Sequence, residues 1–214
     1  MFNQIKAAFI NYAIKKGVLC FGSFKTKAGR MSPYFFNTGL FNDGDSISVF
    51  GDYYAKTILY NKLQFEMLFG PSYKGIPLVV TTAISLTSLN GNYPISFNRK
   101  EEKDHGEGGI IVGAPIKGKV LIIDDVISAG TSVGESVDII KKEGGTPVGV
   151  VIALDRMERG KGELSAVQEV QEKYGIGVTP IITLDDLIEY LQDSPMYKEN
   201  LNNILSYREK YGVK

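Results

Sequence analysis

Short apolar segments alternate with amphipathic segments from residue 45 onward, and this alternation constrains the fold more than any other feature. The segments VLII at 120–123 and VGVVIAL at 148–154 are apolar along their whole length, as strands buried on both faces are. Residues 131–142, which lie between them, have the spacing of a helix. Repeated units of this kind predict an α/β fold with a mainly parallel sheet flanked by helices.

The same pattern predicts the neighbouring elements. Strands are expected near 66–70, 93–97, 119–124, 146–155 and 178–182. Helices are expected near 45–61, 75–89, 131–142 and 163–173, followed by two amphipathic helices within 183–212. Ligands of such sheets bind at the carboxyl ends of the strands, so the residues that follow each strand are the first candidates for a site.

The first 44 residues follow a different pattern. Phe2, Ile5, Phe9 and Tyr12 recur at helical spacing, and aromatic residues with Gly and Pro punctuation in 19–39 predict short strands or a hairpin. A chain of 214 residues with 43% hydrophobic and 22% charged residues fits one globular domain. We therefore expect a single domain of residues 1–214 in which residues 1–44 form a small N-terminal hood subdomain.

Charge and hydropathy exclude several classes of protein. Basic and acidic residues number 24 each, which argues against a nucleic-acid-binding protein, although the first 42 residues contain six basic side chains and no acidic one. The apolar runs are far shorter than the ~18 residues that span a bilayer, so no membrane span is predicted. Cys20 is the single cysteine and cannot form an intrachain disulfide, which fits a reducing, cytoplasmic location.

Residues 99–109, RKEEKDHGEGG, contain no apolar side chain and end in glycines. They predict a mobile surface loop.

Two familiar phosphate-binding motifs are missing. No GxGxxG occurs, which removes the usual dinucleotide fingerprint. GAPIKGKV at 113–120 matches GxxxxGK, but Val120 replaces the required Ser or Thr and the segment precedes a strand instead of opening a helix. It predicts a turn.

The segment VLIIDDVISAGTSVGES at 120–136 joins an apolar strand, two carboxylates, a turn of small residues and the start of a helix. Backbone N–H groups and hydroxyls at a helix N-terminus bind phosphate. Asp124 and Asp125 can accept hydrogen bonds from sugar hydroxyls or hold hydrated Mg²⁺. Taken alone, such an acid pair would more often cap a helix or end a strand, but the whole string outlines a site for a ribose 5-phosphate.

This string resembles the motif with which the type I phosphoribosyltransferases bind 5-phosphoribosyl 1-diphosphate (PRPP). Four further segments resemble the orotate phosphoribosyltransferases, and the resemblance covers essentially the whole chain: FGSFKTKAGRMSPYFFNTGLF at 21–41, LFGPSYKGIP at 68–77, FNRKEEKDHGEGG at 97–109 and ALDRMERG at 153–160. It implies transfer of a phosphoribosyl group from PRPP to orotate, dependence on Mg²⁺, a role in pyrimidine biosynthesis, and a homodimer with shared active sites.

The resemblance also implies roles for individual residues. The catalytic candidates are Lys103, His105 and Asp125. The candidates for PRPP binding are Lys27, Tyr73, Lys74, Arg99, Lys100, Lys103, His105, Asp124, Asp125, Val126, Ile127, Ser128, Ala129, Gly130, Thr131 and Ser132. The candidates for orotate binding are Phe35, Phe36, Ser128 and Arg156. Mg²⁺ is expected to be held mainly by PRPP, with Asp124 and Asp125 reaching it through water.

One residue departs from the family pattern, and two other functions stay open. Ser128 stands where the family commonly has Thr, which preserves the hydroxyl. A phosphoribosyltransferase for another base would not need Arg156, whose guanidinium suits the orotate carboxylate. A regulatory protein that binds PRPP without catalysis would be expected to show a basic face or a degraded 99–109 segment.

Overall fold

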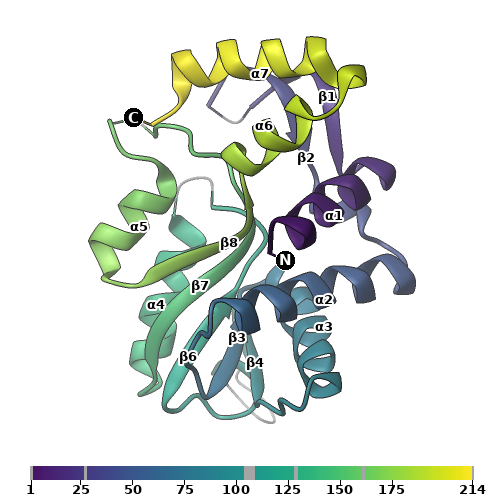
Figure 1. Cartoon of the computed structure of the whole chain (residues 1–214). Coiled ribbons are helices and arrows are strands. Elements are labelled where there is room, and N and C mark those ends of the chain that lie inside the picture. Colours follow the sequence, from purple (N-terminus) through teal and green to yellow (C-terminus); the bar gives the residue numbers. More distant parts are fainter. Residues whose placement is uncertain (1, 27, 104–108, 128–129, 161, 214) are drawn as a thin grey trace.

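The computed structural model describes residues 2–26, 28–103, 109–127, 130–160 and 162–213. Its central feature is a six-stranded sheet in the order β5-β4-β3-β6-β7-β8 (Figure 1). The strands are β3 (Met67–Gly70), β4 (Ile95–Lys103), β5 (Gly109–Gly113), β6 (Lys119–Ile123), β7 (Thr146–Asp155) and β8 (Gly177–Thr183). All pairings are parallel except β4 with β5, which confirms the predicted mainly parallel α/β fold.

Helices cover both faces of this sheet. Helices α2 (Gly44–Tyr60) and α3 (Gly75–Ser88) lie on one face, and α4 (Thr131–Lys142) and α5 (Ala166–Tyr174) lie on the other (Figure 1). Successive side chains of a strand point to opposite faces, so Leu121 and Ile123 of β6 join one hydrophobic core while Val120 and Ile122 join the other. This burial on both sides explains why the central strands are apolar throughout.

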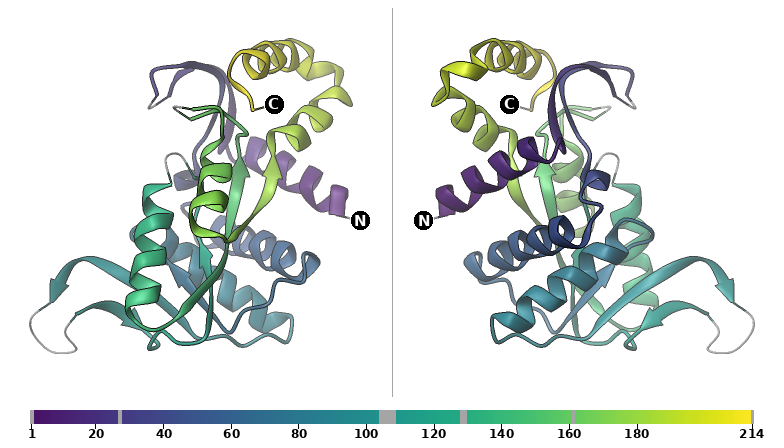
Figure 2. Two further views of the ribbon diagram at one scale, coloured as in Figure 1. Left: turned by 90° about the vertical axis from the view of Figure 1, so that its left-hand side faces the viewer. Right: turned by 90° about the vertical axis from the view of Figure 1, so that its right-hand side faces the viewer.

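A smaller layer covers the carboxyl end of the sheet. Its two-stranded antiparallel sheet consists of β1 (Leu19–Lys25) and β2 (Met31–Phe36), preceded by α1 (Phe2–Lys15) and followed by the 3-10 turn Thr38–Leu40. The C-terminal helices α6 (Leu184–Gln192) and α7 (Lys198–Tyr211), with the 3-10 turn Pro195–Tyr197 between them, pack against this layer (Figures 1 and 2). We call β1, β2, α1, α6 and α7 the hood. The helices α6 and α7 were predicted from the sequence, but their place in the hood was not.

Two segments differ from the sequence predictions. The predicted loop 99–109 begins as strand, because β4 continues to Lys103 and pairs with β5; residues 104–108 lie outside the described residues. The resulting β4–β5 hairpin projects from the body of the molecule (Figure 2). Helix α5 begins at Ala166 and not near 163, because Ser165 and Gln168 form a capping box there.

The remaining predicted elements agree with the structure. Residues 114–118 of GAPIKGKV form an irregular connection from β5 to β6 with bends at Ala114 and Gly118, and Gly118 has a φ of 66°. Within the described part of the chain, no helix has both the length and the hydropathy needed to cross a membrane.

Candidate active site

The sheet reverses its strand order between β3 and β6, and this crevice is where ligands of open α/β sheets bind. From β3 the chain continues through α3 to β4, on one side of β3. From β6 it continues through α4 to β7, on the opposite side. Two polar segments therefore meet at this point, namely 71–74 after β3 and 124–132 after β6.

Asp124 is a buried carboxylate with its hydrogen bonds arranged locally. It is 6% exposed and accepts hydrogen bonds from the hydroxyl of Ser132 (3.0 Å) and the backbone N–H of Asp125 (2.8 Å). Its backbone carbonyl accepts a hydrogen bond from the buried hydroxyl of Tyr54 at 2.7 Å. Burial, and after it the charge of Asp125, raises the pKa of Asp124 to about 6.

Asp125 connects three segments that are distant in sequence. Its Oδ2 atom accepts hydrogen bonds from Lys74 Nζ at 2.6 Å and from the hydroxyl of Thr38 at 2.9 Å. Its Oδ1 atom accepts one from the N–H of Val126 at 2.8 Å. The carboxylate is buried whereas the Lys74 side chain is 60% exposed, so the ammonium group faces the crevice.

The N-termini of the two helices at the crevice lack side-chain caps. Helices α5 and α6 each begin with a capping box, but neither α3 nor α4 has a side-chain hydrogen bond at its N-cap. The N-cap of α4 is Gly130, at a φ of 68°, followed by the exposed Thr131 and Ser132. Unpaired N–H groups are thus available to an anion at this end of α4, whereas the hydroxyl of Ser132 already donates to Asp124.

A second group of cations lies on β4 and the segment after β3. Lys100 Nζ lies 5.1 Å from the centroid of the Tyr73 ring, which is 68% exposed. Arg99 is partly buried, and its Nη1 has no hydrogen-bond partner among the described residues. A buried guanidinium nitrogen without a partner is costly in the absence of a ligand, which suggests an anion at this place.

Arg156 follows β7 and lies beneath the hood. Its guanidinium lies over the ring of Tyr34 at 4.1 Å, donates to the hydroxyl of Ser32 at 2.9 Å, and pairs with Glu158. Ser32 and Tyr34 are buried residues of β2. The arginine therefore lies where the hood meets the carboxyl edge of the sheet.

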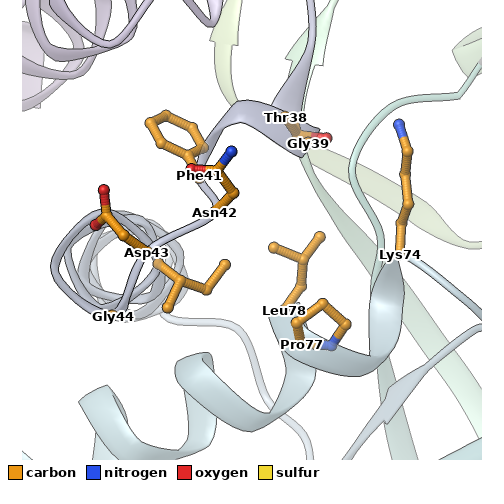
Figure 3. Close-up of a pocket in the computed structure, with 10 residues that line it drawn as sticks. Thr38, Gly39, Phe41, Asn42, Asp43, Gly44, Lys74, Pro77 and Leu78 are labelled. Carbon is orange, nitrogen blue, oxygen red and sulfur yellow. The ribbon is translucent and has the colours of Figure 1, made fainter.

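A pocket of ≈ 440 Å³ opens beside Thr38 and Lys74, the two residues that bind Asp125 (Figure 3). Thr38 and Gly39 line it from the segment after β2, and Lys74, Pro77 and Leu78 line it from the start of α3. Since Thr38 and Lys74 both bind Asp125, the pocket adjoins the acid pair. Its other walls are largely apolar, so we place the chemistry at the acid pair and not in the pocket.

Comparison with known proteins identifies the family. The phosphoribosyl transferase domain family matches residues 48–180. The chain is 57% identical to an orotate phosphoribosyltransferase of Thiobacillus denitrificans (99% of this chain, 100% of that protein) and 60% identical to one of Nitrosospira multiformis (98% and 92%). It also superposes on a crystal structure of orotate phosphoribosyltransferase from Francisella tularensis with a TM-score of 0.88, at 39% identity, covering 96% of this chain and all of that one.

The chain belongs to the orotate phosphoribosyltransferase family. Several site residues predicted from the family motifs come together in the structure: Lys74, Asp124, Asp125, Thr131 and Ser132 meet at the crevice. Val126 and Ile127 follow them and are partly buried. Lys27, His105, Ser128 and Ala129 lie outside the described residues, and of Lys103 the structure describes only the backbone position at the end of β4.

The aromatic pair of the family motif is divided between the two faces of β2. The Phe36 ring packs against Phe9 at 6.3 Å in the core, whereas the Phe35 ring stacks on Phe24 at 5.5 Å and is 45% exposed. Alternation along a strand prevents the two rings from contacting one face of a base together. Contacts of both residues with one ligand would have to include their backbone.

Sequence reasoning missed three residues that hold the site together. Thr38 binds Asp125, Asn98 binds both the backbone N–H and the hydroxyl of Ser72, and Glu158 binds Arg156. Each contact joins segments of different elements or lies in a turn, so no local pattern signals it. All three lie inside the family segments 21–41, 97–109 and 153–160, and only that position could have drawn attention to them.

The donor set at the acid pair suits a partly hydrated Mg²⁺ and not a closed protein site. Among the described residues no group of three or more His, Cys, Asp or Glu side chains could hold a metal ion. Two adjacent carboxylates at the edge of the sheet are the hard oxygen ligands that Mg²⁺ prefers, and this ion commonly keeps several waters and binds substrate phosphates. Asp124 and Asp125 fit such an ion.

Proposed function

We propose that this protein transfers the 5-phosphoribosyl group of PRPP to orotate, giving orotidine 5′-monophosphate and pyrophosphate, in the biosynthesis of pyrimidine nucleotides. The observation that carries the proposal is the buried Asp124–Asp125 pair directly before the uncapped N-terminus of α4, in a chain of this family. The uncapped helix end would hold the 5-phosphate, and the carboxylates would accept hydrogen bonds from the ribose hydroxyls.

The reaction breaks the C1–O bond to pyrophosphate and forms a C1–N bond to the pyrimidine. Its transition state carries positive charge on the ribose and negative charge on the leaving group, so cations at the pyrophosphate and exclusion of water are required. Lys74, Arg99 and Lys100 supply cations at the crevice. Lys103 and His105 would add donors from the β4–β5 hairpin, and Lys27 one from the hood.

Mg²⁺ would be bound mainly by the phosphates of PRPP, with Asp124 and Asp125 reaching it through water. When bound, the ion would neutralise charge on the departing pyrophosphate. Lys74 already lies 2.6 Å from Asp125, so it would share the task of balancing the two carboxylates.

Orotate differs from other nucleobases by its carboxylate, and Arg156 is suited to bind it. A planar guanidinium can form a bidentate pair with a carboxylate, which a lysine matches poorly. The Tyr34 ring beneath it and the Ser32 hydroxyl beside it belong to the hood, so the base would bind between hood and sheet. Purines and uracil lack this carboxylate, which argues against the rival bases.

We also propose a homodimer, formed through α3. No residue of this helix is charged, and Pro77, Val80, Ile84 and Thr87 form one stripe at spacings of three and four residues, with Tyr73 in the turn just before the helix. Tyr73 and Ile84 are 68% and 64% exposed, although large apolar side chains in such a row usually cover a partner. The stripe begins at the crevice, so a second copy packed there would lie beside the active site.

Shared sites can be tested by mixing two inactive variants. If Lys103 acts on the partner's site, a heterodimer of Lys103→Ala and Asp125→Asn subunits contains one intact site and one site with both defects. Random mixing should then restore roughly a quarter of the wild-type activity. Activity that stays near zero after verified subunit exchange would contradict the sharing of sites.

The proposed reaction is tested by the loss of orotate absorbance with PRPP and Mg²⁺, beside uracil, hypoxanthine and adenine as alternative bases. We expect turnover of orotate alone, loss of turnover when Mg²⁺ is chelated, and strong loss in Asp125→Asn. Turnover of a purine would favour another phosphoribosyltransferase. Retained PRPP binding without turnover of any base would favour a regulatory protein.

A cytoplasmic location belongs to the same proposal. Its support is the lone Cys20, a free thiol whose Sγ donates to the carbonyl of Gly17 at 3.0 Å within the hood. Fractionation of cells that produce the protein would test it.

A further inference from the structure

The guanidinium of Arg156 is held along one edge by Glu158. A single carboxylate oxygen, Oε1, lies 2.8 Å from Nε and 2.6 Å from Nη2. Nη2 also donates to the hydroxyl of Ser32 at 2.9 Å. The contacts with Glu158 and Ser32 use Nε and Nη2, so the Nη1 end of the guanidinium is the end that these two residues leave for a ligand.

Glu158 is in turn held by the C-terminal helix. Its second oxygen, Oε2, accepts a hydrogen bond from the hydroxyl of Tyr207 on α7 at 3.1 Å. The side chain of Glu158 is 15% exposed and that of Arg156 is 24% exposed, so water competes little with these contacts. Burial, and after it the charge of Glu158, raises the pKa of Tyr207, which therefore stays a neutral donor at physiological pH.

The backbone fixes the segment that carries both residues. Glu158 forms a β-bridge with Gly212, the N–H of Arg159 donates to the carbonyl of Tyr211 at 2.9 Å, and the N–H of Val213 donates to that of Met157 at 2.9 Å. On the other side, Arg30 at the β1–β2 turn donates to the carbonyls of Arg159 and Gly160 at 2.8 and 3.2 Å. The segment is thus fastened between the two halves of the hood.

We propose that Glu158 and Tyr207 are positioning residues that aim Arg156 at the carboxylate of the base. This inference rests on the proposed function. Glu158 offsets part of the positive charge of Arg156, so it cannot strengthen the general attraction of anions. What it contributes is the orientation of a long side chain, which makes recognition depend on where a carboxylate lies as well as on its charge.

The alternative is a purely structural role, in which the hydrogen bonds that link Arg156, Glu158 and Tyr207 only hold α7 against the body of the protein. The two roles differ in what a substitution changes. A structural role predicts lower stability with the Michaelis constants of both substrates nearly unchanged. A positioning role predicts an effect confined to orotate and dependent on the presence of Arg156.

The experiment compares Glu158→Gln and Tyr207→Phe with the wild type in steady-state kinetics, with each substrate varied in turn. We expect the KM for orotate to rise about tenfold in Glu158→Gln and severalfold in Tyr207→Phe, as is common when a charge-assisted hydrogen bond is lost. The KM for PRPP should stay within about twofold. In an Arg156→Lys background, Glu158→Gln should change the KM for orotate by less than about twofold.

Glu163→Gln and Tyr211→Phe serve as matched controls, because Glu163 is 91% exposed and Tyr211→Phe removes a hydroxyl while keeping the ring that packs against Arg30 and Tyr207. Thermal melting of every variant checks folding, and Tyr207→Phe keeps the test valid if Glu158→Gln does not fold. Unchanged KM values for orotate in both variants, or full effects of Glu158→Gln in the Arg156→Lys background, would overturn the inference. Absence of orotate turnover in the wild type would overturn the proposed function, and the inference with it.

Discussion

At the scale of single residues, the burial of Asp124 makes stability depend on pH. Its pKa is raised from 3.8 to about 6, so between these values the folded state binds more protons than the unfolded state. Stability therefore falls as pH rises through this window, and above pH 6 the folded protein carries the full cost of the ionised carboxylate, about 3 kcal/mol.

Asp124→Asn removes this cost without changing the shape of the side chain. We expect its Tm relative to the wild type, without ligands, to be about 3 °C higher at pH 7.5 than at pH 5. Thermal melting at the two pH values measures the difference. Asp138→Asn, on the exposed face of α4, is the control and should follow the wild type. An Asp124→Asn curve parallel to the wild type would show that Asp124 ionises normally.

At the scale of elements, the start of α4 depends on Gly130. A Cβ atom there would lie 3.0 Å from Cγ2 of Val170, and the φ of 68° is unfavourable for other residues. Gly144, beyond the end of α4, has a φ of 85° with nothing within 4 Å of an added Cβ. We expect Gly130→Ala and Gly144→Ala each to lose about 1 to 2 kcal/mol of stability by denaturant unfolding, but only Gly130→Ala to raise the KM for PRPP. Equal KM values for PRPP in the two variants would contradict the placement of the 5-phosphate at this turn.

The β4–β5 hairpin carries a second prediction at this scale. Lys103 is the last residue of β4, and in the proposed role its ammonium group stabilises the negative charge of the transition state. We expect Lys103→Ala to lower kcat by about two orders of magnitude and to weaken PRPP binding much less. Single-turnover rates and direct titration with PRPP separate the two effects. Lys119→Ala, on the far end of the sheet, is the control; equal losses in rate and binding would contradict the role of Lys103.

Elements were predictable where a single period dominated the sequence. The strands around 120–123 and 148–154 are buried on both faces, so their apolar runs indicated them directly. The segment 99–103 was predicted wrongly as loop because its residues, RKEEK, are all charged and lack the apolar alternation that marks a strand. Backbone pairing with β5 alone makes it a strand.

At the scale of the whole molecule, the neutral stripe on α3 predicts association. Ile84→Asp places a charge at its centre and should convert the homodimer into monomers, observable by sedimentation velocity. Activity should fall severely in parallel, because the proposed site needs the partner's hairpin. Lys56→Asp, on the outside of α2, is the control and should remain dimeric. Wild-type monomers at micromolar concentration would contradict the proposal.

The part of the site that lies in one short stretch of sequence was predictable, and the part built from distant segments was not. The acid pair and the start of α4 lie within nine residues, Asp124 to Ser132, so one contiguous string revealed them. The contact of Thr38 with Asp125 spans 87 positions and that of Tyr207 with Glu158 spans 49, and both arise only when separate elements pack. Local sequence therefore indicates what the site binds, while the groups that orient it depend on the complete fold.

The hood is built from segments that are far apart in the chain, and this determines how it opens locally. Its small sheet comes from residues 19–36 and one of its packing helices from residues 198–211, so closing it requires joining segments that are far apart in the chain. The six-stranded sheet needs neither segment for its own backbone pairing. Amide hydrogens of β1, β2 and α7 should therefore exchange with solvent through partial opening events that leave β6 and β7 protected. The base would then be admitted by a layer that opens while the phosphate-binding sheet stays folded.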